Sequence, residues 1–223
     1  MSAIRFKAII TMTSTLLSSA VAYLRTGQGP APEPAEVVTA LLAAEKQSKR
    51  EKQHYQYEQL LGTWRLGFVS GTQMKRSRPN AKPIKTVGKG RFLPRLLTIS
   101  IAYTATPEPA GMSEPVSAFG VESGAAFGSV TNSVTLGALN LRLQGPTRFW
   151  PNTNSLGFDF TQIQASLGPL KLYDGAMRGG TSKNEAFKTQ TLKDQAFFTY
   201  FLVQAECIAA RGKGGGLALW VRQ

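Results

Sequence analysis

Hydrophobic and polar residues alternate with a period of two along most of the chain after Gly62. Trp64, Leu66 and Phe68 form the first such run, and the alternation returns in later segments that Gly and Pro residues separate. A period of two places alternate side chains on one face of a β-strand. The pattern predicts about eight or nine short strands, with runs at 64–69, 97–103, 115–131, 139–143, 158–160, 170–172, 198–202 and 217–221.

Short connections between these runs set the direction of neighbouring strands. No long helical segment separates consecutive strands, whereas parallel strands need a crossover of about a dozen residues or more. The connections therefore predict an antiparallel sandwich or barrel. Closure removes the unpaired edges that promote aggregation, and a barrel of about eight strands can be filled by side chains or hold one small ligand. We expect a mainly β fold, an antiparallel barrel of about eight or nine strands preceded by an N-terminal helix.

A helical period replaces the alternation in the segment after Pro34. Apolar residues at 37, 38, 41 and 42 fall on one helical face, and Pro34 suits the first turn. The preceding stretch 27–34 is rich in Gly and Pro and is typical of a linker. We therefore divide the chain into a targeting-like or membrane-facing segment with its linker, residues 1–34, and a helix-plus-barrel domain, residues 35–223.

The segment before the linker has three interpretations. Residues 8–24 carry no charge, but six of these seventeen are Ser or Thr, which is too polar for a stable transmembrane helix of about 20 apolar residues. The segment fits a secretory signal with Ala20-Val21-Ala22 as the cleavage pattern, or an organellar transit peptide rich in Ser and Thr. It also fits a helix that packs on the domain or lies on a membrane.

Composition favours binding over catalysis. Hydrophobic residues make up 42% of the 223 residues, which is enough for a packed core. The single His and single Cys exclude an intramolecular disulfide and a Cys/His zinc cluster, and a catalytic triad would depend on His54 alone. The run 211–216 lacks the spacing of a phosphate loop, and nothing in the sequence brings two carboxylates together. We expect no enzyme activity, no cofactor and no metal.

The positive charge is concentrated in one segment. The chain has 26 Lys and Arg against 13 Asp and Glu, a net charge of +13, and residues 73–95 hold eight of the cations and no acid. Such a run is either a solvated loop or a surface for an anionic partner, and an anionic membrane contributes about 1 kcal/mol per cation. Nucleic acid is disfavoured, because Phe92 is the run's only aromatic residue and stacking platforms need several. The expected membrane-surface cations are Lys75, Arg76, Arg78, Lys82, Lys85, Lys89, Arg91 and Arg95.

The motif Gly62-Thr63-Trp64, just after a helix and at the start of the first strand, resembles the opening of lipocalin-like barrels. The resemblance implies that Trp64 plugs the closed end of the barrel and that an Arg from the last strand stacks on it. Arg222 occupies the matching place, and Arg211 is a second candidate. A desolvated cation–π contact of this kind contributes about 2 kcal/mol.

The C-terminal run 198–222 resembles the closing hairpin of the plastid lipid-associated protein (fibrillin) family. It contains an acid, an Ile, an Arg-Gly pair, a Gly-rich turn and a final apolar strand. Gly168-Pro169-Leu170 and Tyr173-Asp174-Gly175 resemble the family's penultimate strands. The resemblance covers about residues 36–222 and is vague from 73 to 150. Glu206 departs from the family, which more often has Asp there.

The resemblance implies a non-catalytic lipocalin-like protein that binds apolar small molecules of the carotenoid, quinone, tocopherol or fatty acyl type. It places the protein at the periphery of thylakoids, or on lipid globules, in plastids or cyanobacteria. The further partners that we expect are an anionic membrane surface, from the basic segment, and, as an option, a partner protein. The alternative function is a structural or assembly protein with a filled barrel that coats lipid bodies or binds a partner protein.

Aromatic residues on the alternating faces are the candidates for cavity lining, although simple packing in a core explains the same pattern. We expect Glu206 and Arg211 to form a structural pair or to anchor the polar head of a ligand. Cys207 alternates with apolar neighbours and is expected to be an inert, buried thiol. The candidate cavity residues are Phe68, Phe158, Phe160, Phe198 and Tyr200.

Overall fold

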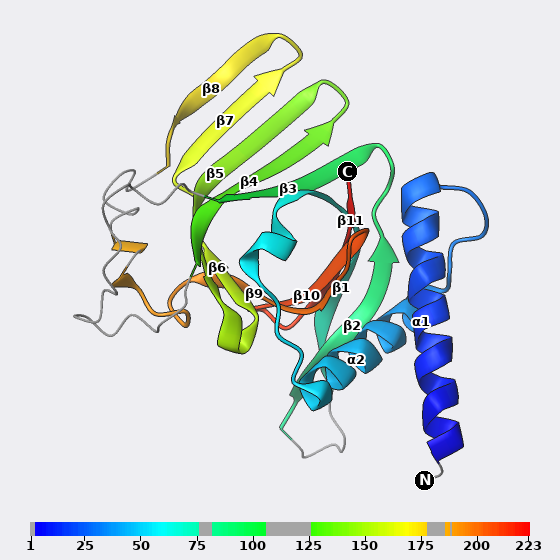
Figure 1. The fold of residues 1–223 in the computed structure, drawn as a ribbon. Helices are drawn as coiled ribbons and strands as arrows, with labels where there is room; N and C mark the ends of the chain where they lie inside the picture. Colours follow the sequence, from blue (N-terminus) through cyan, green and yellow to red (C-terminus); the bar gives the residue numbers. More distant parts are fainter. Residues whose placement is uncertain (1–2, 76–81, 106–125, 178–185, 188) are drawn as a thin grey trace. The chain divides into compact units, whose positions relative to one another are not determined.

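The structure is a computed structural model, which describes residues 3–75, 82–105, 126–177, 186–187 and 189–223. The described chain is mainly β, as predicted, with two α-helices at its N-terminal end (Figure 1). Two short 3-10 helices are also described: Tyr57–Leu60 lies between α2 and β1, and Pro151–Thr153 lies between β5 and β6. The helices are α1 (Ala3–Thr26) and α2 (Pro34–Glu51). The strands are β1 (Gly62–Lys75), β2 (Ile84–Phe92), β3 (Leu97–Ala105), β4 (Ala126–Leu136), β5 (Leu139–Trp150), β6 (Ser155–Phe158), β7 (Gln162–Leu167), β8 (Leu170–Ala176), β9 (Ala196–Val203), β10 (Cys207–Gly212) and β11 (Leu217–Arg222).

The described strands form one hydrogen-bonded antiparallel sheet. Its order is β4-β3-β1-β11-β10-β9-β6-β5-β7-β8, and β2 pairs with β1. A further pairing joins β4 to β5, so eight strands close into an antiparallel barrel while β2, β7 and β8 extend the sheet outside the ring. The prediction of a barrel is confirmed. Of the two short strands expected at 115–131, only β4, from Ala126, lies within the described residues.

The N-terminal segment is helical, and side chains of α1 belong to the buried core cluster. The choice among its three interpretations stays a prediction. Within the described residues, neither helix combines the length and the hydropathy that a membrane crossing requires. The second helix begins as the sequence predicts, with Pro34 in its first turn. It ends at Glu51 and is capped by Lys52, whose φ of 50° is left-handed and whose N–H donates to the carbonyl of Lys49.

The chain divides into two compact units. The first unit contains residues 1–53, 66–93 and 200–223, and therefore holds both helices, β2, β10 and β11. The second contains residues 54–65 and 94–199, and therefore holds the strands from β3 to β8. The division of the chain at residue 34 stays a prediction.

The core of the first unit joins both helices to the strands. Phe68 packs edge-to-face on Phe92, with ring centroids 5.0 Å apart. Tyr23 of α1 also packs edge-to-face on Phe92, at 5.3 Å. Gly90 leaves room for this arrangement, because a Cβ atom there would overlap the ring of Phe68. Apolar side chains of α1, α2, β1, β9, β10 and β11 complete one buried cluster.

The second unit contains a buried tyrosine, Tyr57, whose hydroxyl forms two hydrogen bonds. Tyr57 Oη contacts the carbonyl of Thr104 at 3.1 Å and the hydroxyl of Thr147 at 2.9 Å. Trp64 is fully buried, and its indole N–H donates to the carbonyl of Leu60 at 2.7 Å. Burial and the bond to Thr147 act in opposite senses on the Tyr57 hydroxyl, and burial dominates and raises its pKa.

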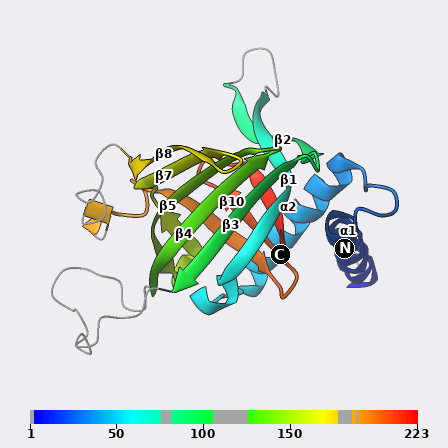
Figure 2. The same ribbon diagram turned by 90° about the horizontal axis from the view of Figure 1, so that it is seen from above.

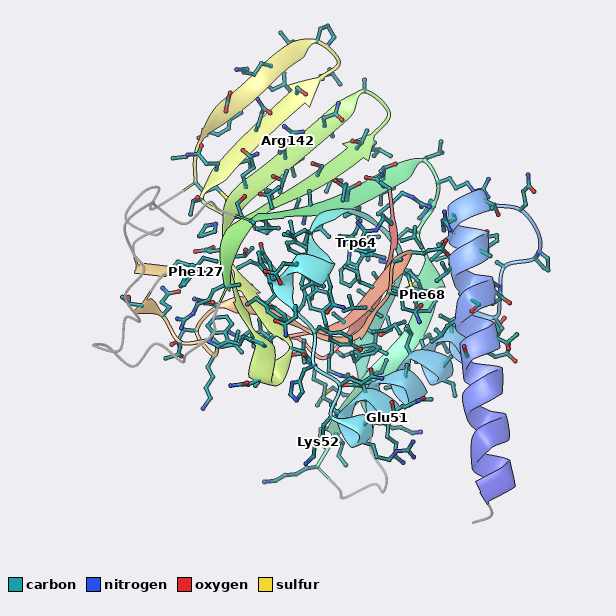
Figure 3. The ribbon with its side chains drawn as sticks, in the orientation of Figure 1. Glu51, Lys52, Trp64, Phe68, Phe127 and Arg142 are labelled. Carbon is teal, nitrogen blue, oxygen red and sulfur yellow. The ribbon has the colours of Figure 1, made fainter. Side chains whose placement is uncertain are left out.

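Strands β3, β4, β5, β7 and β8 of the second unit lie side by side as one twisted sheet (Figures 1 and 2). Residues that face each other across antiparallel strands project from the same side of the sheet. One side therefore carries apolar rows such as Ile99, Val134 and Leu141. The other side carries the polar residues between them, for example Ser133 opposite Arg142. Arg142 projects from β5 in Figure 3.

Candidate functional site

A pocket opens in the first unit between α1, the C-terminal half of α2 and the turn from β9 to β10. Its volume is about 830 Å³. This lies within the range of about 300–1,000 Å³ that is typical of small-molecule sites. The lining consists of Ser14, Leu17, Ser18, Val21, Ala22, Arg25, Thr26, Ala44, Gln47, Ser48, Gln53, Phe201, Leu202, Gln204, Ala205, Glu206 and Cys207.

The floor of the pocket is apolar because it is also the surface of the core. Leu17, Val21, Phe201 and Cys207 are buried members of the core cluster and line the pocket as well. They come from successive turns of α1 and from both ends of the β9–β10 turn. A guest that contacts this floor would remove apolar surface from water, at about 25 cal/mol per Å².

An ion pair stands at the rim of the pocket. Arg25 Nη1 of α1 lies 2.5 Å from Glu206 Oε1 of the β9–β10 turn. Both side chains are largely exposed to water, so the pair contributes at most about 1 kcal/mol to folding. Its structural effect is to hold the C-terminal end of α1 against the turn.

A second ion pair ties α2 to β10 beneath the surface. The guanidinium of Arg211 donates to both carboxylate oxygens of Glu45, from Nε at 2.9 Å and from Nη2 at 2.5 Å. Its Nη1 donates to the carbonyl of Gly215 at 2.6 Å. Lys49, one helical turn further along α2, adds a bond of 2.8 Å to Glu45. Glu45 is only 7% exposed, so the bonds satisfy a buried charge.

These bonds correct the predicted pair of Glu206 with Arg211. Arg211 instead pairs with Glu45, and Glu206 pairs with Arg25. The physical reason is that α2 brings a buried carboxylate to Arg211, whereas Glu206 lies in an exposed turn. Burial alone would raise the pKa of Glu45, but the bonds and charges of Arg211 and Lys49 outweigh it and lower the pKa. The same bond to Glu45 raises the pKa of Arg211.

Cys207 presents a neutral thiol to the pocket. Burial, with a smaller contribution from the charge of Glu206, raises the pKa of Cys207 to about 11. The thiol lies 3.4 Å from the side-chain oxygen of Gln204, to which it donates. Because the thiolate is the nucleophilic form, this cysteine is chemically inert at neutral pH.

The five predicted cavity aromatics fall into separate groups. Phe158 stacks on Phe198 and lies beside Phe160 in the second unit, with centroids 5.1 and 5.5 Å apart. Phe68 belongs to the core of the first unit, where Tyr200 lies 6.5 Å from the ring of Trp220. The described pocket is lined by none of these five residues, and the lining of another cavity by them stays a prediction. Sequence reasoning missed Phe201, because it lies on the opposite face of β9 from the alternation that was followed.

The two residues of the predicted plug, Trp64 and Arg222, each form a hydrogen bond with another residue. Trp64 is buried and bonded to Leu60. Arg222 donates from Nε to the carbonyl of Ala205 at 2.6 Å. Stacking of Arg222 on Trp64 stays a prediction.

The predicted basic segment covers the end of β1 and all of β2. Lys75, Lys82, Lys85, Lys89 and Arg91 are all exposed there, and Arg95 is exposed in the second unit. Arg76 and Arg78 lie outside the described residues.

Two apolar side chains on the β1–β2 hairpin escaped the sequence analysis. Met74 and Ile84 are exposed and pair across the strands with Lys85 and Lys75, so an apolar residue and a cation stand together on each face. In the described part of the chain, no group of three His, Cys, Asp or Glu residues is placed to hold a metal ion.

Comparison with known proteins adds no relative. No family model, no curated protein and no solved structure matches the chain. The resemblance to the fibrillin family therefore stays a prediction.

Proposed function

We propose that the chain is a non-catalytic protein that binds an apolar small molecule of the carotenoid, quinone, tocopherol or fatty acyl type. The supporting observation is the pocket of about 830 Å³, whose floor is the apolar core surface at Leu17, Val21 and Phe201. The charged groups on its lining, Arg25 and Glu206, are paired with each other, and the thiol of Cys207 is neutral at physiological pH. Such a lining suits a guest that is apolar over most of its length.

The rim is compatible with a neutral polar group at one end of the guest. Amide and hydroxyl side chains line the pocket from α1, from α2 and the residues just after it, and from the β9–β10 turn. These groups can donate to a carbonyl or accept from a hydroxyl without any change of charge. The residues are Ser14, Ser18, Gln47, Gln53 and Gln204.

The place of action in this proposal is a photosynthetic membrane or a lipid globule. The exposed cations of the β1–β2 hairpin favour an anionic lipid surface, at about 1 kcal/mol for each Lys or Arg near it. Met74 and Ile84 supply apolar contacts beside these cations. A peripheral protein placed in this way could exchange its guest with the lipid phase.

The test is ligand capture by the purified protein. The protein is extracted with organic solvent, and co-purified apolar molecules are identified by mass spectrometry. Binding of a fluorescent fatty acid is then compared in two variants of α1, Ser18→Trp and Ser19→Trp. Both serines are exposed, but only Ser18 lines the pocket.

We expect Ser18→Trp to weaken binding about tenfold or more, because the indole occupies guest volume, while Ser19→Trp binds as the native chain does. Equal binding by the native chain and Ser18→Trp contradicts the pocket as the site. Absence of any co-purified or captured apolar molecule would favour the alternative of a structural protein with a filled barrel.

A further inference from the structure

Four leucines line up at one end of the sheet in the second unit. Leu136 pairs with Leu139, Leu139 pairs with Leu167, and Leu167 pairs with Leu170. Directly opposed residues share a face, so these side chains form one row across β4, β5, β7 and β8. Each is between 45% and 61% exposed. We call the row Leu136, Leu139, Leu167 and Leu170 the leucine edge.

The leucine edge sits on two hairpin turns of the same design. Each turn has the sequence Leu-Gly-x-Leu, at residues 136–139 and 167–170. The glycines, Gly137 and Gly168, have left-handed φ values of 58° and 55°, a conformation that tight hairpin turns require and glycine adopts readily. The two turns therefore present their leucines in the same way.

The backbone of this edge is hydrogen-bonded within itself. The N–H of Gly168 donates to the carbonyl of Ala138 at 2.7 Å, which links the two turns. The side chain of Asn140 donates to the same carbonyl at 3.3 Å and accepts from Thr135 at 2.8 Å. A backbone that enters a lipid surface must satisfy its polar groups internally. These bonds satisfy the carbonyl of Ala138 in the turn between β4 and β5.

The charges around the leucine edge are complementary to anionic lipid. Strands β4, β5, β7 and β8, as described, contain one acid, Asp174, and it bonds Lys171 at 2.8 Å. Arg142 lies on β5, three residues beyond Leu139 and on the opposite face. Arg95 and Leu96 precede Leu97, which pairs with Leu136, and Leu96 is 83% exposed. Cations and apolar side chains therefore meet at the same end of the sheet.

We propose that the leucine edge inserts into the surface of an anionic lipid layer and anchors the second unit there. This contact is separate from the pocket and from the basic hairpin, so it extends the proposed function. Exposed leucines in one row mark an interaction surface. A lipid layer is favoured over a second copy of this chain because the apolar groups project at turns with a bonded backbone and are flanked by cations.

The test is binding to vesicles of phosphatidylcholine mixed with phosphatidylglycerol, measured by flotation of the full chain. The variant is Leu167→Asp, and its matched control is Ser166→Asp. The two positions are adjacent and on opposite faces, and both variants change the net charge equally. We expect Leu167→Asp to lower the vesicle-bound fraction about tenfold or more, and Ser166→Asp to lower it less than about threefold. An equal loss in both variants, or no loss in Leu167→Asp, would overturn the proposal.

A second measurement, of fluorescence, reports insertion directly and does not place a charge on the leucine edge. An environment-sensitive fluorophore is attached at Leu139→Cys, in a chain whose own Cys207 is buried. We expect its emission to shift to the blue and intensify when vesicles are added, and an unchanged emission contradicts insertion. Ser18→Trp should keep native vesicle binding, which separates failure of this proposal from failure of the pocket.

Light scattering tests whether a second copy of this chain, rather than a lipid layer, covers the leucine edge. If the native chain is a dimer, if Leu167→Asp makes it a monomer, and if vesicle binding is the same in both, then the leucine edge is a contact between copies. That result would overturn the lipid proposal.

Discussion

Arg211 of β10 donates two parallel hydrogen bonds, of 2.9 and 2.5 Å, to the carboxylate of Glu45 of α2. The two residues are 166 positions apart in the chain. The pair fixes α2 on the closing hairpin of the first unit, and the bond from Arg211 to the carbonyl of Gly215 fixes the hairpin turn as well. Because Glu45 lies next to Ala44 on α2, the pair also positions the part of α2 that lines the pocket, at Ala44, Gln47 and Ser48.

Replacing Glu45 by Gln should destabilise the first unit. The substitution keeps the shape of the side chain but leaves the guanidinium of Arg211 without its counter-charge. Hydrogen bonds to charged groups contribute about 1.5–3 kcal/mol, so we expect a loss of about 2–3 kcal/mol in the free energy of unfolding in urea. Glu51→Gln is the control, since Glu51 lies on the same helix and is exposed, and it should cost less than about 1 kcal/mol. Equal losses would contradict a special role for Glu45.

The same carboxylate should make stability depend on acid pH. The pKa of Glu45 in the folded chain is lowered from its ordinary value of 4.5. The unfolded chain then binds the proton more readily, so the contribution of Glu45 is complete above pH 4.5 and is lost as pH falls through the lower, folded pKa. Urea unfolding of the native chain and of Glu45→Gln between neutral pH and pH 3 measures this. The difference between them should shrink with acid, and a constant difference would contradict the lowered pKa.

Most of the strands were predictable because the alternation that marks them is local, but β2, β7 and β10 lie outside the predicted runs. The alternation around Trp64 and Phe68 predicted β1, and Pro34 predicted the start of α2. Long-range pairing was not predictable. No local pattern indicates that Arg211 meets Glu45 rather than Glu206, because α2 must first pack on β10.

The leucine edge was missed for a related reason. Leu139 and Leu170 were both assigned to strands, but their alignment depends on strand register, which the turns at Gly137 and Gly168 set. Repetition of the Leu-Gly-x-Leu motif was the available signal. Phe201 was not predicted because it lies on the opposite face of β9 from Phe198, Tyr200 and Leu202.

Cys207 should resist alkylation in the folded chain. With a pKa of about 11, about one thiol in a thousand is ionised at pH 8, and the side chain is buried as well. We expect iodoacetamide to modify the folded chain at least about a hundredfold more slowly than the chain in urea, as followed by mass spectrometry. Rapid modification of the folded protein would show that the β9–β10 end of the pocket opens readily.

Gly128 of β4 should not tolerate a side chain. A Cβ atom at this position would overlap the hydroxyl of Tyr57 and the carbonyl of Thr104, which are hydrogen-bonded to each other in the core of the second unit. Gly128→Ala must therefore break that bond or displace the strand, and we expect a loss of about 2–4 kcal/mol in the free energy of unfolding. Gly71→Ala is the control, because a Cβ atom there has no neighbour within 4 Å. Its free energy should change by less than about 1 kcal/mol, and combining Gly128→Ala with Tyr57→Phe should recover part of the loss, since the second change removes the overlapping hydroxyl. A native-like stability of Gly128→Ala alone would contradict this packing.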